Sequence, residues 1–162
     1  MARPTDAPKR PITPAGYAKL DDELQRLWRQ DRPKIVQEVS DAAAMGDRSE
    51  NAEYIFGKKK LREIDRRVKY LSQLLDRLTV IDPASNAQDR VDFGATVTIE
   101  DEDGRTKVYQ LVGEDEIEAK AGRISMKSPV GRALLGKLEG DEVTIIRPAG
   151  ELDVVIKRIS YH

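Results

Sequence analysis

The sequence predicts an α+β protein in which an N-terminal antiparallel coiled-coil hairpin of helices precedes a small α+β domain. Three observations lead to this prediction. Two long helical patterns flank a short polar segment, residues 46–53, which contains glycine and several acidic residues. A turn-forming segment, residues 81–90, follows the second helical pattern. Beyond it the apolar residues recur with a period of two, which is typical of strands with one buried face.

The first helix is predicted to begin at Thr13 and to run to about Ala44. Threonine is a favourable N-cap, and Pro14 at the first helical position loses no hydrogen bond. Pro33 falls inside this helix, so we expect a kink or a local break there. Residues 1–12 contain three prolines and no apolar run, and they are therefore predicted to form a disordered tail.

The second helix, predicted over residues 50–79, carries a narrow apolar stripe. Its members recur at spacings of three and four residues, which is the pattern of a coiled-coil seam. They are Leu61, Ile64, Val68, Leu71, Leu75 and Leu78. The first helix has matching apolar residues, and Tyr17 and Trp28 follow their spacing. Both aromatic residues are therefore expected to pack inside the hairpin, which spans residues 13–80.

The second domain is predicted over residues 91–162, after a linker at 81–90. Alternating apolar residues on both sides of a turn predict a β-hairpin at its start. A short helix is expected to begin at Ser128 and Pro129. The strands are expected at 93–100, 107–112, 123–126, 143–146 and 152–159. The result is a domain of about five strands and one helix.

The polar segment at 46–53 has two interpretations. In the first, Asp47 is the N-cap of the second helix and Glu50 is its reciprocal partner in a capping box. In the second, Asp47 and Glu50 present carboxylate oxygens to Mg²⁺, which prefers such hard ligands. Two carboxylates do not complete an octahedral shell, so a partner would supply the other ligands. The spacing alone leaves both interpretations open.

Five basic residues of the second helix lie within about 100° of one another around the helix axis, roughly opposite the apolar stripe. This basic stripe consists of Lys58, Lys59, Arg62, Arg66 and Lys69. It is either a solvated face with ion pairs along the helix, such as Glu63 with Arg67 and Asp65 with Lys69, or a contact for a phosphate backbone. Tyr54 either packs against the hairpin or stacks near a nucleotide.

The composition excludes several classes of site. The chain has no cysteine, and its single histidine is His162. Disulfides and thiolate metal sites are therefore excluded, and no histidine-based acid–base catalysis is expected. No segment approaches the roughly 20 apolar residues that cross a membrane. We therefore expect no membrane association and predict a cytoplasmic protein.

Three blocks of residues resemble a known family, the bacterial Gre transcript cleavage factors, and the GreB type in particular. The first block is Gly46-Asp47-Arg48-Ser49-Glu50-Asn51-Ala52, and the second is the basic run Lys58-Lys59-Lys60-Leu61-Arg62. The third is Ser128-Pro129 followed by Arg132-Ala133-Leu134-Leu135. The resemblance extends over nearly the whole chain, from Ile12 to Tyr161.

This resemblance implies a fold and a partner. Family members have an FKBP-like second domain that docks at the rim of the secondary channel of bacterial RNA polymerase, and they pass the coiled coil down that channel. Docking is thereby implied for Ser128, Pro129 and Arg132. The basic stripe matches the patch that contacts the extruded 3′ segment of the nascent RNA. We expect the factor to act as a monomer.

The resemblance also implies a mechanism in which the chain is a cofactor protein and not an enzyme. Asp47 and Glu50 would hold Mg²⁺ jointly with polymerase carboxylates, and Ser49 would support the attacking water or the turn. The factor would complete the polymerase site that cleaves backtracked RNA, which rescues arrested complexes. An inhibitor that binds the channel without cleavage is the alternative function, although the intact acids speak against it. A coiled-coil adaptor or direct RNA binder is a third class.

Overall fold

The computed structural model describes residues 9–46 and 51–162. They form two compact units. One is Tyr17–Arg77, and the other combines the described residues up to Gly16 with Leu78–His162. No helix within these residues is both long and apolar enough to cross a membrane.

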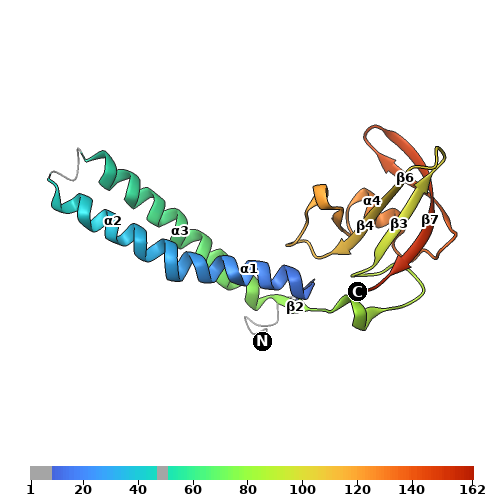
Figure 1. The fold of residues 1–162 in the computed structure, drawn as a ribbon, viewed down its shortest axis with the longest axis horizontal. Helices are drawn as coiled ribbons and strands as arrows, with labels where there is room; N and C mark the ends of the chain where they lie inside the picture. The colour runs from blue at the N-terminus through green and yellow to red at the C-terminus, as the bar shows by residue number, and fades with distance from the viewer. Residues whose placement is uncertain (1–8, 47–50) are drawn as a thin grey trace, which may run out of the picture. The chain divides into compact units, whose positions relative to one another are not determined.

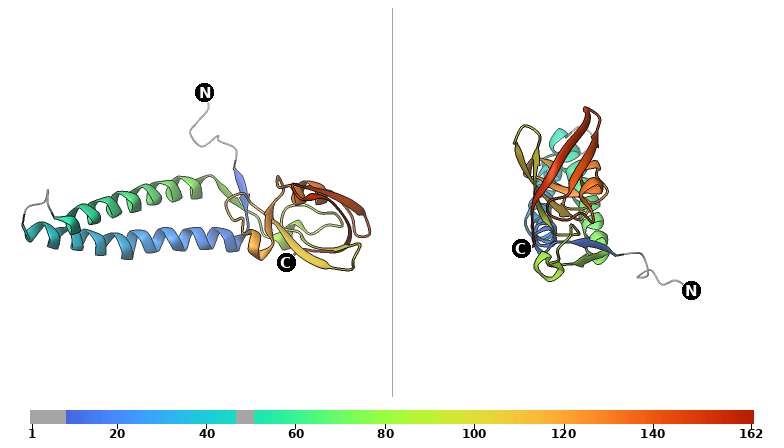
Figure 2. Two further views of the ribbon diagram at one scale, coloured as in Figure 1. Left: turned by 90° about the horizontal axis from the view of Figure 1, so that it is seen from above. Right: turned by 90° about the vertical axis from the view of Figure 1, so that its right-hand side faces the viewer.

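The first unit is a hairpin of helices. Two segments of helix, joined by a short π-helical turn, run toward the tip, and a single long helix returns. The elements are α1 (Pro14–Arg26), η2 (Leu27–Asp31), α2 (Arg32–Ala44) and α3 (Ala52–Asp76). In both Figure 1 and Figure 2, α2 and α3 lie side by side along their lengths. The predicted antiparallel hairpin is therefore confirmed.

The π-helical turn η2 is explained by Pro33. Proline has no N–H to donate, and its ring clashes with the carbonyl group four residues earlier in a regular helix. Here the N–H of Arg32 donates to the carbonyl of Leu27, five residues back, which widens the turn and relieves that clash. The local break predicted from Pro33 is thus present as one wide turn.

The seam of the hairpin is narrow. Ile35 and Ala42 of α2 are buried with Ile64, Leu71 and Leu74 of α3. The remaining members of the predicted stripe in α3 are half-buried. Leu78, the last predicted member, lies beyond α3 and begins a strand.

Two further contacts shape the hairpin. Gly57 faces Val39, and a Cβ atom at Gly57 would lie 2.7 Å from Val39 Cγ2, so only glycine permits this approach of α3 to α2. Trp28, in η2, is 55% exposed, and the guanidinium carbon of Arg32 lies 5.4 Å from the centre of its ring. The prediction that Trp28 packs inside the hairpin is therefore wrong, whereas Tyr17 is half-buried.

The second unit contains a curled mixed sheet of five strands (Figures 1 and 2). The strands are β3 (Thr96–Asp101), β4 (Thr106–Val112), β5 (Arg123–Ser125), β6 (Glu142–Arg147) and β7 (Gly150–Ser160). Their order is β5-β4-β3-β7-β6, and every neighbouring pair is antiparallel except β4 and β5. The short helix α4 (Pro129–Leu134) lies against β5 and β6. The predicted five strands and one helix, and the α+β class, are confirmed.

Alternating residues of the strands form the core of this unit. In β3, for example, Val97 and Ile99 are buried while their neighbours are only half-buried. They pack with Leu111 of β4, Leu134 of α4 and Ile156 of β7. This alternation is the period-two pattern from which the sheet was predicted.

Part of the segment predicted as a disordered tail forms a strand. β1 (Arg10–Ile12) pairs in parallel with β2 (Leu78–Val80). Ile12 is fully buried, and its carbonyl accepts a hydrogen bond of 2.8 Å from the N–H of Ile81. These residues are therefore ordered by the burial of Ile12 and by pairing with a strand that is distant in sequence. Neither effect can be read from the local sequence.

Glu116 binds the start of α1. Its carboxylate accepts hydrogen bonds from the N–H of Thr13 at 2.8 Å, from the N–H of Gly113 at 2.9 Å and from the Thr13 hydroxyl. The same hydroxyl oxygen accepts from the N–H of Gly16 at 3.1 Å, which confirms Thr13 as the N-cap. A Cβ atom at Gly16 would clash with the Glu116 carboxylate, so a larger residue there would displace this carboxylate from its hydrogen bonds.

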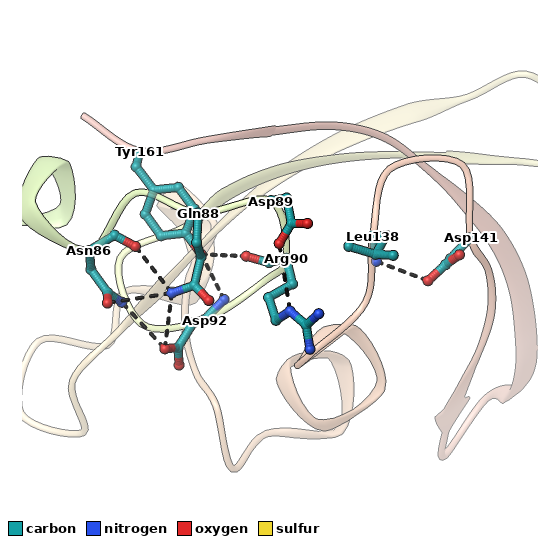
Figure 3. Close-up of polar contacts among 8 residues, drawn as sticks. All are labelled: Asn86, Gln88, Asp89, Arg90, Asp92, Leu138, Asp141 and Tyr161. Carbon is teal, nitrogen blue, oxygen red and sulfur yellow. Dashed lines mark hydrogen bonds and ion pairs between the residues drawn. The ribbon is translucent and has the colours of Figure 1, made fainter.

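The segment predicted as a linker at 81–90 is tied to the second unit (Figure 3). It contains the short helix η3 (Pro83–Asn86). The Tyr161 hydroxyl donates to the Arg90 carbonyl at 2.6 Å and accepts from the N–H of Asp92 at 2.9 Å. Burial raises the pKa of this phenol. These bonds fix the path of the chain where it enters β3.

Candidate functional site: the hairpin end and its charged faces

The two helices of the hairpin are joined at their ends by Asn51. Its side-chain oxygen accepts a hydrogen bond of 3.1 Å from the N–H of Tyr54, which makes Asn51 the N-cap of α3. Its side-chain nitrogen donates to the carbonyl of Ala42 in α2 at 2.7 Å. One amide group therefore caps α3 and satisfies a carbonyl at the end of α2.

This cap corrects one interpretation of the acidic segment. The capping-box prediction placed the N-cap at Asp47, but α3 begins at Ala52 with Asn51 as its cap. Asparagine is among the strongest N-cap residues, and its position directly before the helix was a signal available in the sequence. Asp47, Ser49 and Glu50 themselves lie outside the described residues.

The chemistry of the donors at the tip fits magnesium. Asp47 and Glu50 supply carboxylate oxygens, the ligands that Mg²⁺ prefers. Among residues 9–46 and 51–162, no group of three or more acidic, histidine or cysteine side chains is placed to hold a metal ion.

The basic stripe is confined to one side of α3, and its charges are unpaired among the described residues. Lys59, Arg62, Arg66 and Lys69 are exposed, and Lys58 is half-buried. Within the described residues, no carboxylate forms an ion pair with any of the five. This leaves the stripe available to an anionic partner.

Asp65 and Arg67, which have the spacing of pairs along α3, each pair across the hairpin instead. Asp65 accepts a hydrogen bond of 2.8 Å from Arg32 of α2. Arg67 binds Glu23 of α1 through two hydrogen bonds, of 2.6 and 2.9 Å. The predicted pairs of Glu63 with Arg67 and of Asp65 with Lys69 are therefore wrong.

These ion pairs shift the pKa values of Glu23, Arg67 and Arg32. The hydrogen bond from Arg67 is the main cause that lowers the pKa of Glu23, and the hydrogen bond to Glu23 raises the pKa of Arg67. The hydrogen bond to Asp65 raises the pKa of Arg32. Each shift favours the charged form of the group concerned.

The predicted docking residues lie at the start of α4, where two of them have a structural role. The Ser128 hydroxyl accepts from the N–H of Gly131 at 3.0 Å and donates to the carbonyl of Ser125 at 2.6 Å, so Ser128 is the N-cap. Pro129 is the first helical residue. Arg132 is exposed. Of the three, Arg132 is the side chain with the greatest reach toward a partner.

Comparison with known proteins identifies the family. The family profile described as "Transcription elongation factor, N-terminal" matches residues 10–80, and "Transcription elongation factor, GreA/GreB, C-term" matches residues 85–161. The chain belongs to the GreA/GreB family of transcription elongation factors. Together the two matches cover the hairpin and the sheet domain, so the family predicted from the resemblance is confirmed.

Several relatives are similar over almost their whole length. The chain is 50% identical over 150 residues to transcription elongation factor GreB of Haemophilus influenzae, covering 93% of this chain and 95% of that protein. It is 51% identical to GreB of Yersinia pestis, covering 93% and 88%. Among solved structures, it matches the GreA factor homolog 1 protein of Thermus thermophilus at 24% identity and a TM-score of 0.43, covering 94% of this chain and 99% of that one.

Proposed function

We propose that the chain is a transcript cleavage factor of bacterial RNA polymerase. Its hairpin enters the secondary channel and stimulates Mg²⁺-dependent endonucleolytic cleavage of the backtracked RNA 3′ end, which rescues arrested complexes. It acts in the cytoplasm as a monomer. It is a cofactor protein that completes the intrinsic cleavage site of the polymerase, in keeping with its membership in a family of elongation factors.

One observation carries this proposal: Asn51 caps α3. An acid at a hairpin end is commonly explained as a helix cap. Because Asn51 already fills that role, Asp47 is not needed to begin the helix. The proposal therefore gives Asp47 a role other than helix capping, and Glu50 shares that role.

Asp47 and Glu50 are the residues that would hold Mg²⁺ together with carboxylates of the polymerase. Such an ion, when bound, stabilises the charge that develops on a phosphodiester during hydrolysis. The chain's own contribution is to deliver two carboxylates on the end of a hairpin, which raises their effective concentration at the reacting centre. Ser49, between them, would orient a water molecule or support the turn.

The basic stripe would hold the extruded RNA. Successive phosphates of a single strand present a line of negative charge, and Lys58, Lys59, Arg62, Arg66 and Lys69 form a line of cations along α3. Because these cations have no acidic partner among the described residues, no ion pair with those residues has to break when RNA binds. Docking of the second unit on the polymerase would use Arg132, with Ser128 and Pro129 shaping the helix that carries it.

The test is cleavage of 3′-labelled RNA in a stalled, backtracked polymerase complex. Wild type, Asp47→Asn and a reaction without factor are compared at one Mg²⁺ concentration. Short labelled fragments with wild type alone support the proposal. Inhibition of transcription without fragments would assign the chain to the class of channel-binding inhibitors. No effect on the polymerase would leave only the adaptor class.

A further inference from the structure

A groove runs between α2 and α3 near the tip, on a face that the proposed RNA contact does not use. Ile35 and Ala42, both 4% exposed, form its floor, and Met45 and Phe56 stand at its sides. We call this the tip groove. Its volume is about 470 Å³, within the range of about 300–1,000 Å³ of pockets that hold small ligands.

The chain leaves the apolar side chains of the tip groove largely uncovered. Met45 is 81% exposed and Phe56 is 66% exposed. Burying such a side chain against a partner stabilises a complex through the hydrophobic effect. Large apolar residues on both sides of a groove, above a buried apolar floor, are the usual form of a site that receives one apolar side chain of a partner.

The rim of the tip groove is acidic. Glu38, Asp41 and Glu53 line it, against one cation, Lys60. Asp41 accepts a hydrogen bond of 2.8 Å from Gln37. Within the described part of the chain, none of these three carboxylates forms an ion pair with a lysine or arginine. The groove therefore combines an apolar interior with unpaired negative charge.

The negative charge of the rim determines whether the tip groove suits nucleic acid or protein. A phosphate backbone would be repelled by the rim, so nucleic acid does not fit. At 100° per residue, Phe56 and Lys60 lie about 120° and 160° around the axis of α3 from Arg62, near the middle of the basic stripe. The hairpin end thus carries two faces of opposite charge, and only the stripe suits RNA.

We propose that the tip groove binds a short protein segment that carries a large apolar side chain flanked by lysine or arginine. The apolar side chain enters between Met45 and Phe56, and the flanking cations pair with Glu38 and Glu53. This inference rests on the proposed function, because it places the segment in the RNA polymerase that surrounds the inserted hairpin. The groove would then hold the tip on protein while the basic stripe holds RNA.

The first experiment measures affinity for core RNA polymerase free of nucleic acid. The groove variants are Met45→Ala with Phe56→Ala, and Glu38→Lys with Glu53→Lys. Ile55→Ala is the matched control for the apolar pair, because Ile55 is 52% exposed beside Phe56 but does not line the groove. Asp22→Lys with Asp76→Lys is the control for the charge reversal, because both acids are exposed on the same hairpin away from the groove.

Each groove variant should raise the Kd about tenfold, which is typical of the loss of an interface anchor, while both controls stay within about twofold. Equal affinity of wild type and both groove variants would overturn the inference, and wild-type cleavage in the same preparation would show that the proposed function survives. A wild type that neither binds the polymerase nor supports cleavage would overturn both.

The second experiment identifies what the groove contacts. A benzophenone amino acid replaces Phe56, and Ile55 in a control, and each variant is photo-crosslinked in a backtracked complex. We expect a crosslink from position 56 to a polymerase peptide with an apolar residue within four positions of lysine or arginine. A crosslink to RNA from position 56, or the same crosslink from both positions, would contradict the proposal.

Discussion

Four arginine residues of the hairpin form two pairs that differ in where their charge is used. Arg32 and Arg67 reach across to carboxylates on a neighbouring helix, at 2.8 and 2.6 Å. Arg62 and Arg66 belong to the basic stripe of α3 and have no carboxylate partner among the described residues. The hairpin therefore has one pair of arginine residues that link its helices and another pair whose charge is left for a partner.

This difference shows how to distinguish structural from functional charge in a chain where 35% of residues are charged. A cation in an ion pair must break that pair before it binds a ligand, whereas an unpaired cation only has to release bound water. The same comparison extends to the acids. Glu116, Asp65 and Glu23 are bound within the chain, while Glu38 and Glu53 form no ion pair among the described residues.

The largest effect on folding is expected from Glu116→Ala. It removes the acceptor for the N–H groups of Thr13 and Gly113, both of which are buried. Leaving such donors unsatisfied lowers the free energy of unfolding by about 1–3 kcal/mol. Urea titration followed by circular dichroism measures this loss. The exposed Glu102→Ala is the control, and an equal change in both variants would contradict the role assigned to Glu116.

The double variant Arg62→Ala with Arg66→Ala tests the unpaired group. We expect cleavage of RNA backtracked by many nucleotides to fall about tenfold, with a shallower salt dependence, because two phosphate contacts are lost. The melting temperature should stay unchanged because neither residue is paired within the described structure. Cleavage rates of long and dinucleotide-length 3′ ends measure the effect. Equal loss on both substrates would count against the basic stripe as an RNA contact.

The variant Arg67→Ala tests the paired group. It should lower the free energy of unfolding by about 0.5–1 kcal/mol, since exposed but bidentate pairs are worth about that much, and less in high salt. The loss should appear in thermal unfolding at low ionic strength and shrink at 1 M salt. RNA cleavage per folded molecule should match wild type. A selective loss of long-RNA cleavage would show that the division between the two groups is wrong.

The smallest effect is a pH dependence from Glu23. Its pKa is lowered in the folded hairpin, mainly by the hydrogen bond from Arg67. The stabilisation is therefore fully present above the unfolded pKa of glutamate, about 4.3, and is lost as the pH falls through the lower folded value. The difference in melting temperature between wild type and Glu23→Gln should shrink between pH 6 and pH 3. A constant difference would contradict this assignment.

Most of the fold could be predicted from the sequence because the spacing of apolar residues and the residue types of turns and helix caps depend only on nearby residues. The seam residues Ile64 and Leu71, the N-caps Thr13 and Ser128, and the five strands all follow from such signals. Trp28 was misplaced because the wide turn at Leu27–Asp31 interrupts the helical period there. β1 was missed because it depends on β2, more than sixty residues away in sequence.

The site was harder to predict because it depends on which residues meet across two helices. Glu63 with Arg67 and Asp65 with Lys69 have the spacing of helix pairs. The register of the hairpin instead brings Glu23 to Arg67 and Arg32 to Asp65, and sequence spacing carries no information on that register. Asn51 and Asp47 are both good caps by residue type, so only the observed start of α3 decides between them.

The most direct test of the account compares the Mg²⁺ dependence of RNA cleavage for wild type and Asp47→Asn in the same backtracked polymerase complex. Thermal unfolding of both proteins is measured alongside. Since Asn51 caps α3, we predict equal melting temperatures and equal polymerase affinity, with cleavage by Asp47→Asn reduced at least about a hundredfold across the Mg²⁺ range. A lower melting temperature with cleavage proportional to the folded fraction would contradict the account and return Asp47 to a structural role.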